Sequence, residues 1–179
     1  MPKTNKIIFF TFIYFCIILF IFFVVAFYFG VRVNLSASYP LGIYLLDKSK
    51  KNYNKNDMVL FCPPQNKIFK DVIQNGYLSF GICPGGITPL HKKIVALAGD
   101  YVMIKDEQVY INNTLQPKSK IFKIDSFGKN IKSIYTGGYI TPGEFLPMSD
   151  FDERSFDGRY FGTIPLKNII GHLKPIYLY

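Results

Sequence analysis

Histidine and cysteine are scarce in this sequence, and tryptophan is absent: the 179 residues include two histidines, three cysteines and no tryptophan. The histidines, His91 and His172, are far apart in the chain, and no Cys-x-x-Cys pair exists, so we expect neither a metal site nor a cofactor. Without a usable histidine, a hydrolase of this sequence needs another general base. Lysine can serve, because burial of its charged form lowers its pKa.

Charge is absent from Ile7 to Val31. A helix of this length extends about 37 Å at about 1.5 Å per residue, which is enough to cross a hydrocarbon core of about 30 Å. No small-residue cleavage site follows it, so we expect an uncleaved signal anchor. The predicted division of the chain is a cytoplasmic terminus at 1–6, a transmembrane anchor at 7–31 and an exported domain at 32–179.

The chain is basic, with a formal net charge of +9. Lys3 and Lys6 favour a cytoplasmic N-terminus, whereas Arg32 and the lysines at 48, 50 and 51 on the far side of the span argue against it. We expect a single-pass protein of the inner membrane, in contact with lipid, whose domain lies on the periplasmic side. The lysines are scattered and form no nucleic-acid-binding motif, so we expect no nucleic-acid partner.

The three cysteines divide into two groups. Cys16 lies inside the apolar run, where we expect only packing. Cys62 and Cys83 lie in the exported part, and an exported compartment is oxidising, so they predict a disulfide. It would close a loop of about 20 residues and stabilise the protein by about 3 kcal/mol in the chain-entropy treatment. The alternative is two unpaired thiols.

Short apolar runs between polar turns predict a mainly β domain with short helices. Strands are expected in GIYLLD, DMVLFC, KKIVALAGD and TPGEFLPMSD, in a hairpin over YVMIKDEQVYIN, and in the C-terminal RYFGTIPLKNIIGHLKPIYLY. A short helix is expected at Asn66–Gln74, before Asn75-Gly76. The domain is of a size that suits one compact unit.

A serine and two lysines are candidates for nucleophilic chemistry. Ser38 lies in the tight turn of NLSASYPLGIY, directly after the apolar run. Lys92 and Lys93 begin an apolar strand, and adjacent strand residues point to opposite faces, so one of them points inward. The pattern alone does not distinguish which one. The alternative is a pair of solvated lysines with no catalytic role.

Three motifs occur in the order typical of the type I signal peptidases, which are membrane-bound Ser–Lys proteases that remove leader peptides. SASYP resembles their Ser-x-Ser-x-Pro box, KKIVALAGD resembles their lysine box, and MSDFDERSFDGRYFG resembles their Gly-Asp-Asn-Arg-Asp-Asn-Ser box. NLSASYPLGIY and the cysteine-bearing segment before the lysine box are most similar to the conjugal-transfer (TraF-like) branch. The resemblance covers essentially the whole chain and implies a signal-peptidase-like antiparallel β-sheet domain.

The resemblance also implies roles for the matching residues. Ser38 falls on the nucleophile and Lys92 on the general base. The backbone N–H of Ser38 and the hydroxyl of Ser36 fall on the oxyanion donors. Ser155 is expected to orient Lys92. A supporting ion pair is expected between Asp157 and Arg159.

Some positions depart from the motifs or have a simpler interpretation. Ser36 can be a turn-capping hydroxyl and Ser155 an N-cap. His91 is expected on the surface beside the lysine, and His172 is also expected to have no catalytic role. The departures from the family motifs are Ala98, Ser149-Asp150, the FDER segment at 151–154 and Gly158.

These features leave three functions. The first is a peptidase that removes the leader of a conjugative pilin or another type IV secretion subunit, so that its partner is a precursor protein. The second is a general leader peptidase. The third is a membrane-anchored assembly protein without enzymatic activity. The small size and the cysteine segment favour the first.

Overall fold

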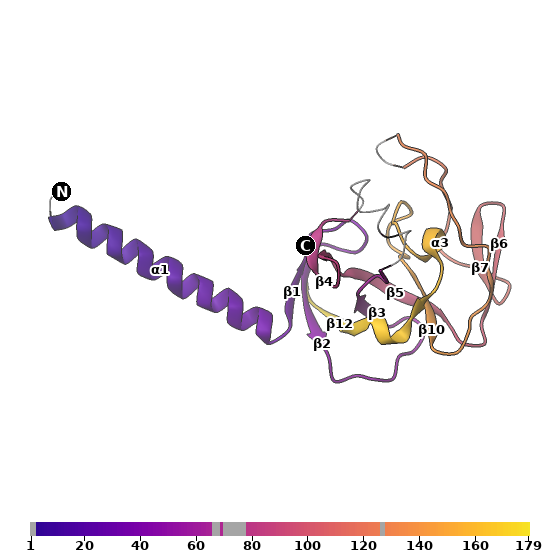
Figure 1. Ribbon diagram of the computed structural model, residues 1–179, viewed down its shortest axis with the longest axis horizontal. Coiled ribbons are helices and arrows are strands. Elements are labelled where there is room, and N and C mark those ends of the chain that lie inside the picture. The colour runs from indigo at the N-terminus through magenta and orange to yellow at the C-terminus, as the bar shows by residue number, and fades with distance from the viewer. Residues whose placement is uncertain (1–2, 66–68, 70–77, 126–127) are drawn as a thin grey trace.

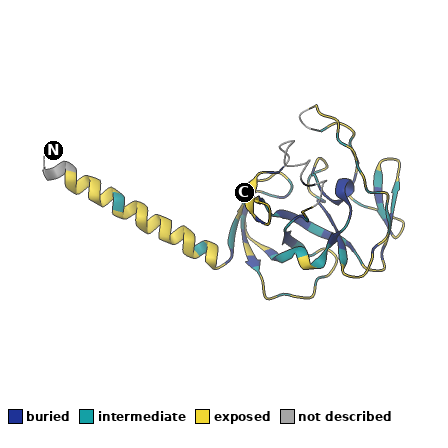
Figure 2. Cartoon of the chain, in the orientation of Figure 1, coloured by how far each residue is buried: buried dark blue, intermediate teal, exposed yellow. Residues whose placement is uncertain are grey.

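A computed structural model describes residues 3–65, 69, 78–125 and 128–179. One long helix, α1 (Lys3–Tyr28), projects from a β domain (Figure 1). Its surface is almost entirely exposed (Figure 2). Residues Lys6–Tyr28 are long and apolar enough to cross a membrane, by length and composition.

The helix ends at Tyr28, before the predicted end of the span at residue 31, because the chain turns at Gly30 into the first strand. Gly30 has a positive φ of 91°, and a Cβ there would lie 2.6 Å from the carbonyl oxygen of Leu46. The carbonyl of Gly30 accepts a hydrogen bond of 2.8 Å from the Leu46 amide. The junction between helix and domain therefore requires glycine.

The larger sheet has seven strands, and each neighbouring pair is antiparallel. Their order is β1 (Val31–Asn34), β2 (Gly42–Asp47), β12 (Ile169–Leu178), β3 (Met58–Phe61), β5 (Leu90–Leu97), β10 (Glu144–Met148) and β11 (Ile164–Pro165). The domain is mainly β, as predicted from the sequence.

A second sheet has four strands and lies on the side of the domain away from α1 (Figure 1). Its order is β8 (Thr114–Leu115), β7 (Gln108–Ile111), β6 (Tyr101–Lys105) and β9 (Gly138–Tyr139). In the part of the chain that the structure describes, the remaining elements are β4 (Phe80–Cys83), the short helix α3 (Gly158–Phe161) and the 3-10 helix η1 (Leu166–Asn168).

The predicted strands in GIYLLD, DMVLFC, KKIVALAGD and TPGEFLPMSD are present as β2, β3, β5 and β10, and the predicted hairpin is β6–β7. Strands β1, β4 and β9 were not predicted. The predicted helix Asn66–Gln74 lies outside the described residues except for Phe69, which is buried.

The strand that positions the site is β5, which lies between β3 and β10. Lys92, Ile94 and Ala96 occupy every second position of β5 and point to the same face, and all three are buried. Ile94 packs in a core with Val59 and Phe145. The period of two in this strand therefore directs Lys92 into the domain.

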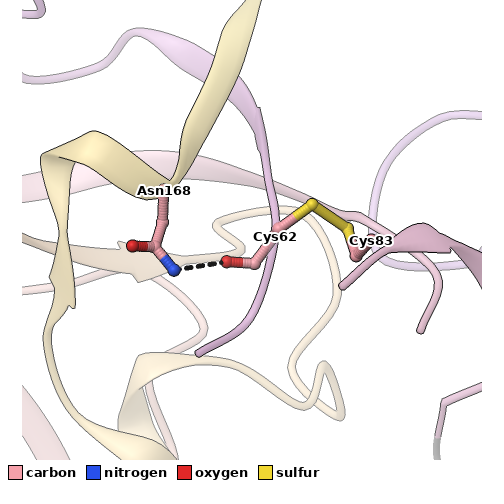
Figure 3. The surroundings of a disulfide bond; sticks show 3 residues. All are labelled: Cys62, Cys83 and Asn168. Carbon is pink, nitrogen blue, oxygen red and sulfur yellow. Dashed lines mark hydrogen bonds between the residues drawn. A yellow bond between two sulfur atoms is a disulfide. The ribbon is translucent and has the colours of Figure 1, made fainter. Parts of the chain in front are cut away.

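The structure contains the predicted disulfide between Cys62 and Cys83, with Cα atoms 5.5 Å apart (Figure 3). Asn168 forms two hydrogen bonds with the backbone of Cys62. Its side-chain amide donates to the carbonyl of Cys62 at 2.9 Å, and its backbone carbonyl accepts from the Cys62 amide. The bridge joins the end of β3 to β4. Cys16 is a free thiol on the exposed surface of α1.

Candidate active site

The turn that carries Ser38 connects β1 to β2, and Asn34 organises it. The side-chain amide of Asn34 donates to the carbonyl oxygens of Ser36, Tyr39 and Pro40 at 3.0–3.2 Å. Its oxygen accepts from the amide and the hydroxyl of Ser36 at 3.1 and 2.7 Å. One side chain thus closes the turn around the serine. The sequence signal for this role is the Asn-x-Ser-x-Ser spacing, although the spacing alone does not predict it.

The hydroxyl of Ser36 is engaged within the turn. Because the amide nitrogen of Asn34 faces three carbonyls, its oxygen is the acceptor, and the Ser36 hydroxyl must donate to it. To donate to an oxyanion, this hydroxyl has to rotate away from Asn34. Its role as an oxyanion donor stays a prediction.

Ser38 is also contacted by two serines of the motif MSDFDERSFDGRYFG, which begins at the end of β10. The hydroxyl of Ser149 donates to the carbonyl oxygen of Ser38 at 2.6 Å and accepts from the amides of Phe151 and Asp152, both at 3.1 Å. The hydroxyl of Ser155, which is buried, lies 3.3 Å from that of Ser38. Ser155 therefore contacts the candidate nucleophile, and its predicted effect on Lys92 stays a prediction.

The two adjacent lysines have different environments. Lys92 is 3% exposed, and burial is the main reason that its pKa falls from 10.5 to about 8. The charge of Arg159 lowers this pKa further, while Asp157 and Asp152 oppose the shift. Lys93 points to the other face of β5 and forms an ion pair with Asp150. Of the two, Lys92 has the environment that a general base requires.

Ser36, Ser38, Lys92 and Ser155 line one open cavity of about 550 Å³. The structure thus brings together a candidate nucleophile, a candidate base and two further hydroxyls from segments far apart in the sequence. A cavity of this size admits several residues of an extended peptide.

Asp157 and Arg159 follow the segment that lines this cavity, and their side chains are fully buried. Their side chains form two parallel hydrogen bonds, from Nε to Oδ1 at 2.9 Å and from Nη2 to Oδ2 at 2.8 Å. Asp157 also accepts from the amide of Ser149 at 2.9 Å and caps α3 through the amide of Arg159. The Arg159 Nη1 donates to the carbonyls of Lys118 and Glu153 at 2.5 and 2.8 Å. The pair thus supports the segment that contacts Ser38.

His91 was expected on the surface, and this expectation was wrong. It is 8% exposed, stacked on Tyr39 with ring centroids 4.8 Å apart and edge-on to Tyr44 at 4.8 Å. Tyr39 comes from the turn that carries Ser38 and Tyr44 from β2, and their rings pack against His91. Burial, with a smaller effect from the charge of Lys92, lowers the pKa of His91 to about 3, so the ring is neutral.

His172 lies 3.5 Å from Asp57, away from the cavity. Among the described residues, no group of three or more His, Cys, Asp or Glu side chains could hold a metal ion.

Two of the departures from the family motifs have a structural explanation. A Cβ at Gly158 would lie 2.6 Å from the carbonyl oxygen of Pro147 and 2.7 Å from a methyl of Leu146, so no larger residue fits. Ser149 supplies the hydroxyl that holds Ser38. Ala98 is exposed beside the turn at Gly99 that ends β5, and nothing in the structure explains it.

The chain is similar to known proteins over nearly its whole length. The family described as "Signal peptidase, peptidase S26" matches residues 4–178. The chain is 38% identical over 148 residues to a plasmid transfer protein TraF of Escherichia coli, covering 82% of both chains. It is 36% identical over 150 residues to a conjugal transfer protein TraF of Agrobacterium fabrum (strain C58), covering 84% of both.

Among solved structures, a signal peptidase I from Enterococcus faecalis V583 matches 69% of this chain and 97% of its own, with a TM-score of 0.42 and 19% identity. Together with the order of its motifs, the match over residues 4–178 and the identity to the two TraF proteins show that the chain belongs to the S26 family of signal peptidases.

Proposed function

We propose that this protein is a membrane-anchored serine endopeptidase that removes leader peptides from exported precursors by means of a Ser38–Lys92 dyad. The observation that carries the proposal is the environment of Lys92, whose pKa burial lowers to about 8 at the cavity that also contains Ser38. The similarity to conjugal transfer proteins supports a precursor from a conjugation system as the substrate, such as a pilin or another type IV secretion subunit.

In this mechanism, neutral Lys92 takes the hydroxyl proton of Ser38 as Oγ attacks the scissile carbonyl. The amide of Ser38, joined by the hydroxyl of Ser36 once it leaves Asn34, donates to the oxyanion. One such donor is commonly worth about 3 kcal/mol in the barrier. Lys92 then gives its proton to the leaving amine. A water molecule hydrolyses the resulting ester, so that the acid leaves and Ser38 regains its proton.

The anchor and the disulfide support a location on the outer side of the inner membrane. Helix α1 is long and apolar enough to span, and the Cys62–Cys83 bridge is typical of an oxidising compartment. In this arrangement Ser38 lies a few residues beyond the bilayer, close to the place where a leader peptide's cleavage site emerges.

The test compares cleavage by wild type, Ser38→Ala, Lys92→Met and Lys93→Met in cells depleted of their own leader peptidase. The probe is a pilin-like precursor from a conjugation system. We expect wild type and Lys93→Met to process the precursor, and Ser38→Ala and Lys92→Met to leave it intact. We expect none of the four proteins to restore growth of the depleted cells. Restored growth would favour the general leader peptidase. No processing by a folded, inserted wild type would favour the assembly protein.

A further inference from the structure

The structure contains a second hollow beside the active-site cavity. It has a volume of about 360 Å³, and its lining includes Lys120, Phe122, Lys123 and Arg154. Arg154 lines both this hollow and the cavity that contains Ser38. The two hollows therefore adjoin at Arg154.

The charge of this hollow is positive on balance. Three cations, Lys120, Lys123 and Arg154, stand against two carboxylates, Glu107 and Asp125, which leaves a formal charge of +1. Lys123 is already paired with Glu107 at 2.6 Å. In the described part of the chain, Lys120 and Arg154 form no ion pair. Both lie instead over the ring of Phe122, at 5.3 and 4.7 Å from its centroid.

The backbone that carries these cations is held firmly. The buried Arg159 donates to the carbonyl of Lys120 at 3.3 Å, and the amide of Phe122 donates to the hydroxyl of Tyr160 at 3.1 Å. The amide of Ile121 donates to the carbonyl of Glu107 at 2.6 Å, which places the segment beside the β6–β7 turn. The backbone of this segment is thus ordered without a ligand, while the cationic side chains on it stay exposed.

The position of the hollow indicates which part of a substrate reaches it. The end of the active-site cavity that includes Arg32 and Asn34 belongs to β1, which directly follows α1. The β6–β7 turn belongs to the sheet on the side away from α1 (Figure 1). A leader peptide that remains in the membrane would approach from the β1 end, so the residues after the cut run towards Arg154. The same position disfavours a lipid headgroup as the occupant.

We propose that the hollow formed by Lys120, Phe122, Lys123 and Arg154 binds an acidic side chain that follows the cleavage site, and that it selects precursors carrying one. This inference rests on the proposed peptidase function and adds a preference for substrate. The charges attract a carboxylate, and the aliphatic parts and the Phe122 ring cover its methylene groups. Because these groups are exposed, the preference is modest and salt-dependent.

The probes are synthetic peptides with alanine at the first and third residues before the cut. Each peptide carries one glutamate at a chosen position after the cut, and its matched partner carries glutamine at the same position. Successive positions after the cut are tested in turn. We expect wild type to cleave one glutamate peptide about three- to five-fold faster in kcat/KM than its glutamine partner. Arg154→Gln and Lys120→Gln should each reduce this ratio towards one. Lys48→Gln removes an equal charge from an exposed loop and should leave the ratio unchanged.

Binding of the same peptides to Ser38→Ala protein, followed by fluorescence anisotropy, separates the two proposals. If wild type cleaves no peptide but Ser38→Ala still prefers glutamate through Arg154, the peptidase function fails and the acidic site stands. If wild type cleaves glutamate and glutamine peptides equally at every position, or if Lys48→Gln lowers the ratio as much as Arg154→Gln, the acidic site is refuted.

Discussion

Replacing Lys92 by methionine is expected to inactivate the protein and to make it more stable. Lys92 is 3% exposed, and burial lowers its pKa from 10.5 to about 8. At about 1.4 kcal/mol for each tenfold change in proton affinity, the difference corresponds to about 3 kcal/mol by which folding disfavours the charged amine. Methionine has a similar shape and no charge, so Lys92→Met removes this cost.

The lowered pKa of Lys92 makes the stability gain from Lys92→Met depend on pH. The unfolded chain keeps a proton on Lys92 up to a pH of about 10.5, whereas the folded protein keeps it only up to about 8. Between these values the unfolded state binds more protons, so the stability of the wild type rises with pH. The gain from Lys92→Met is therefore about 3 kcal/mol at pH 7 and falls to about 2 kcal/mol at pH 9.

The assay is urea unfolding of the full chain in detergent, followed by circular dichroism at both pH values, with cleavage measured in parallel. The matched control is Lys93→Met. Lys93 is paired with Asp150 on the partly exposed face of β5, so this variant should show no gain in stability. A Lys92→Met protein that is less stable than wild type at pH 7, or whose gain does not shrink towards pH 9, would refute the reasoning.

Three further predictions follow from the site. The kcat/KM of the wild type should rise about tenfold from pH 7 to pH 9, because the neutral fraction of a base with a pKa of about 8 rises from about 0.1 to about 0.9 over this range. A kcat/KM that stays constant over this range would contradict a lysine base. Protein in membranes isolated from cells should resist alkylation at Cys62 and Cys83 until it is reduced, and Cys62→Ser with Cys83→Ser should lower the free energy of unfolding by about 3 kcal/mol; two thiols that react without reductant would exclude the bridge in the cell. Ser149→Ala removes the 2.6 Å hydrogen bond to the Ser38 carbonyl and should lower kcat about tenfold with KM little changed, whereas an unchanged kcat would show that the bond does not position the nucleophile.

The sequence predicted most of the fold because its strands are short apolar runs bounded by clear turns. Strand β5 is the best example, since its alternation alone required one of two lysines to face inward. The choice of Lys92 needed the family resemblance, and the burial of Lys92 agrees with it.

The missed features depend on contacts between distant segments. His91 has no apolar pattern of its own, and it is buried because Tyr39 and Tyr44 close over it from another part of the chain. Asn34 and Ser149 gain their roles only when the turn of Ser38 meets the segment after β10. Such roles are set by three-dimensional packing, which no local period encodes.

The junction at Gly30 fastens the end of α1 to the β domain. Its carbonyl is hydrogen-bonded to β2, and Arg32 donates from Nη1 to the carbonyl of Phe27 at the end of α1, at 2.8 Å. These hydrogen bonds leave little freedom between α1 and the domain. If the protein cleaves precursors as proposed, they would set the height of Ser38 above the bilayer, and the spacing between a precursor's membrane segment and its cleavage site would become part of what is recognised.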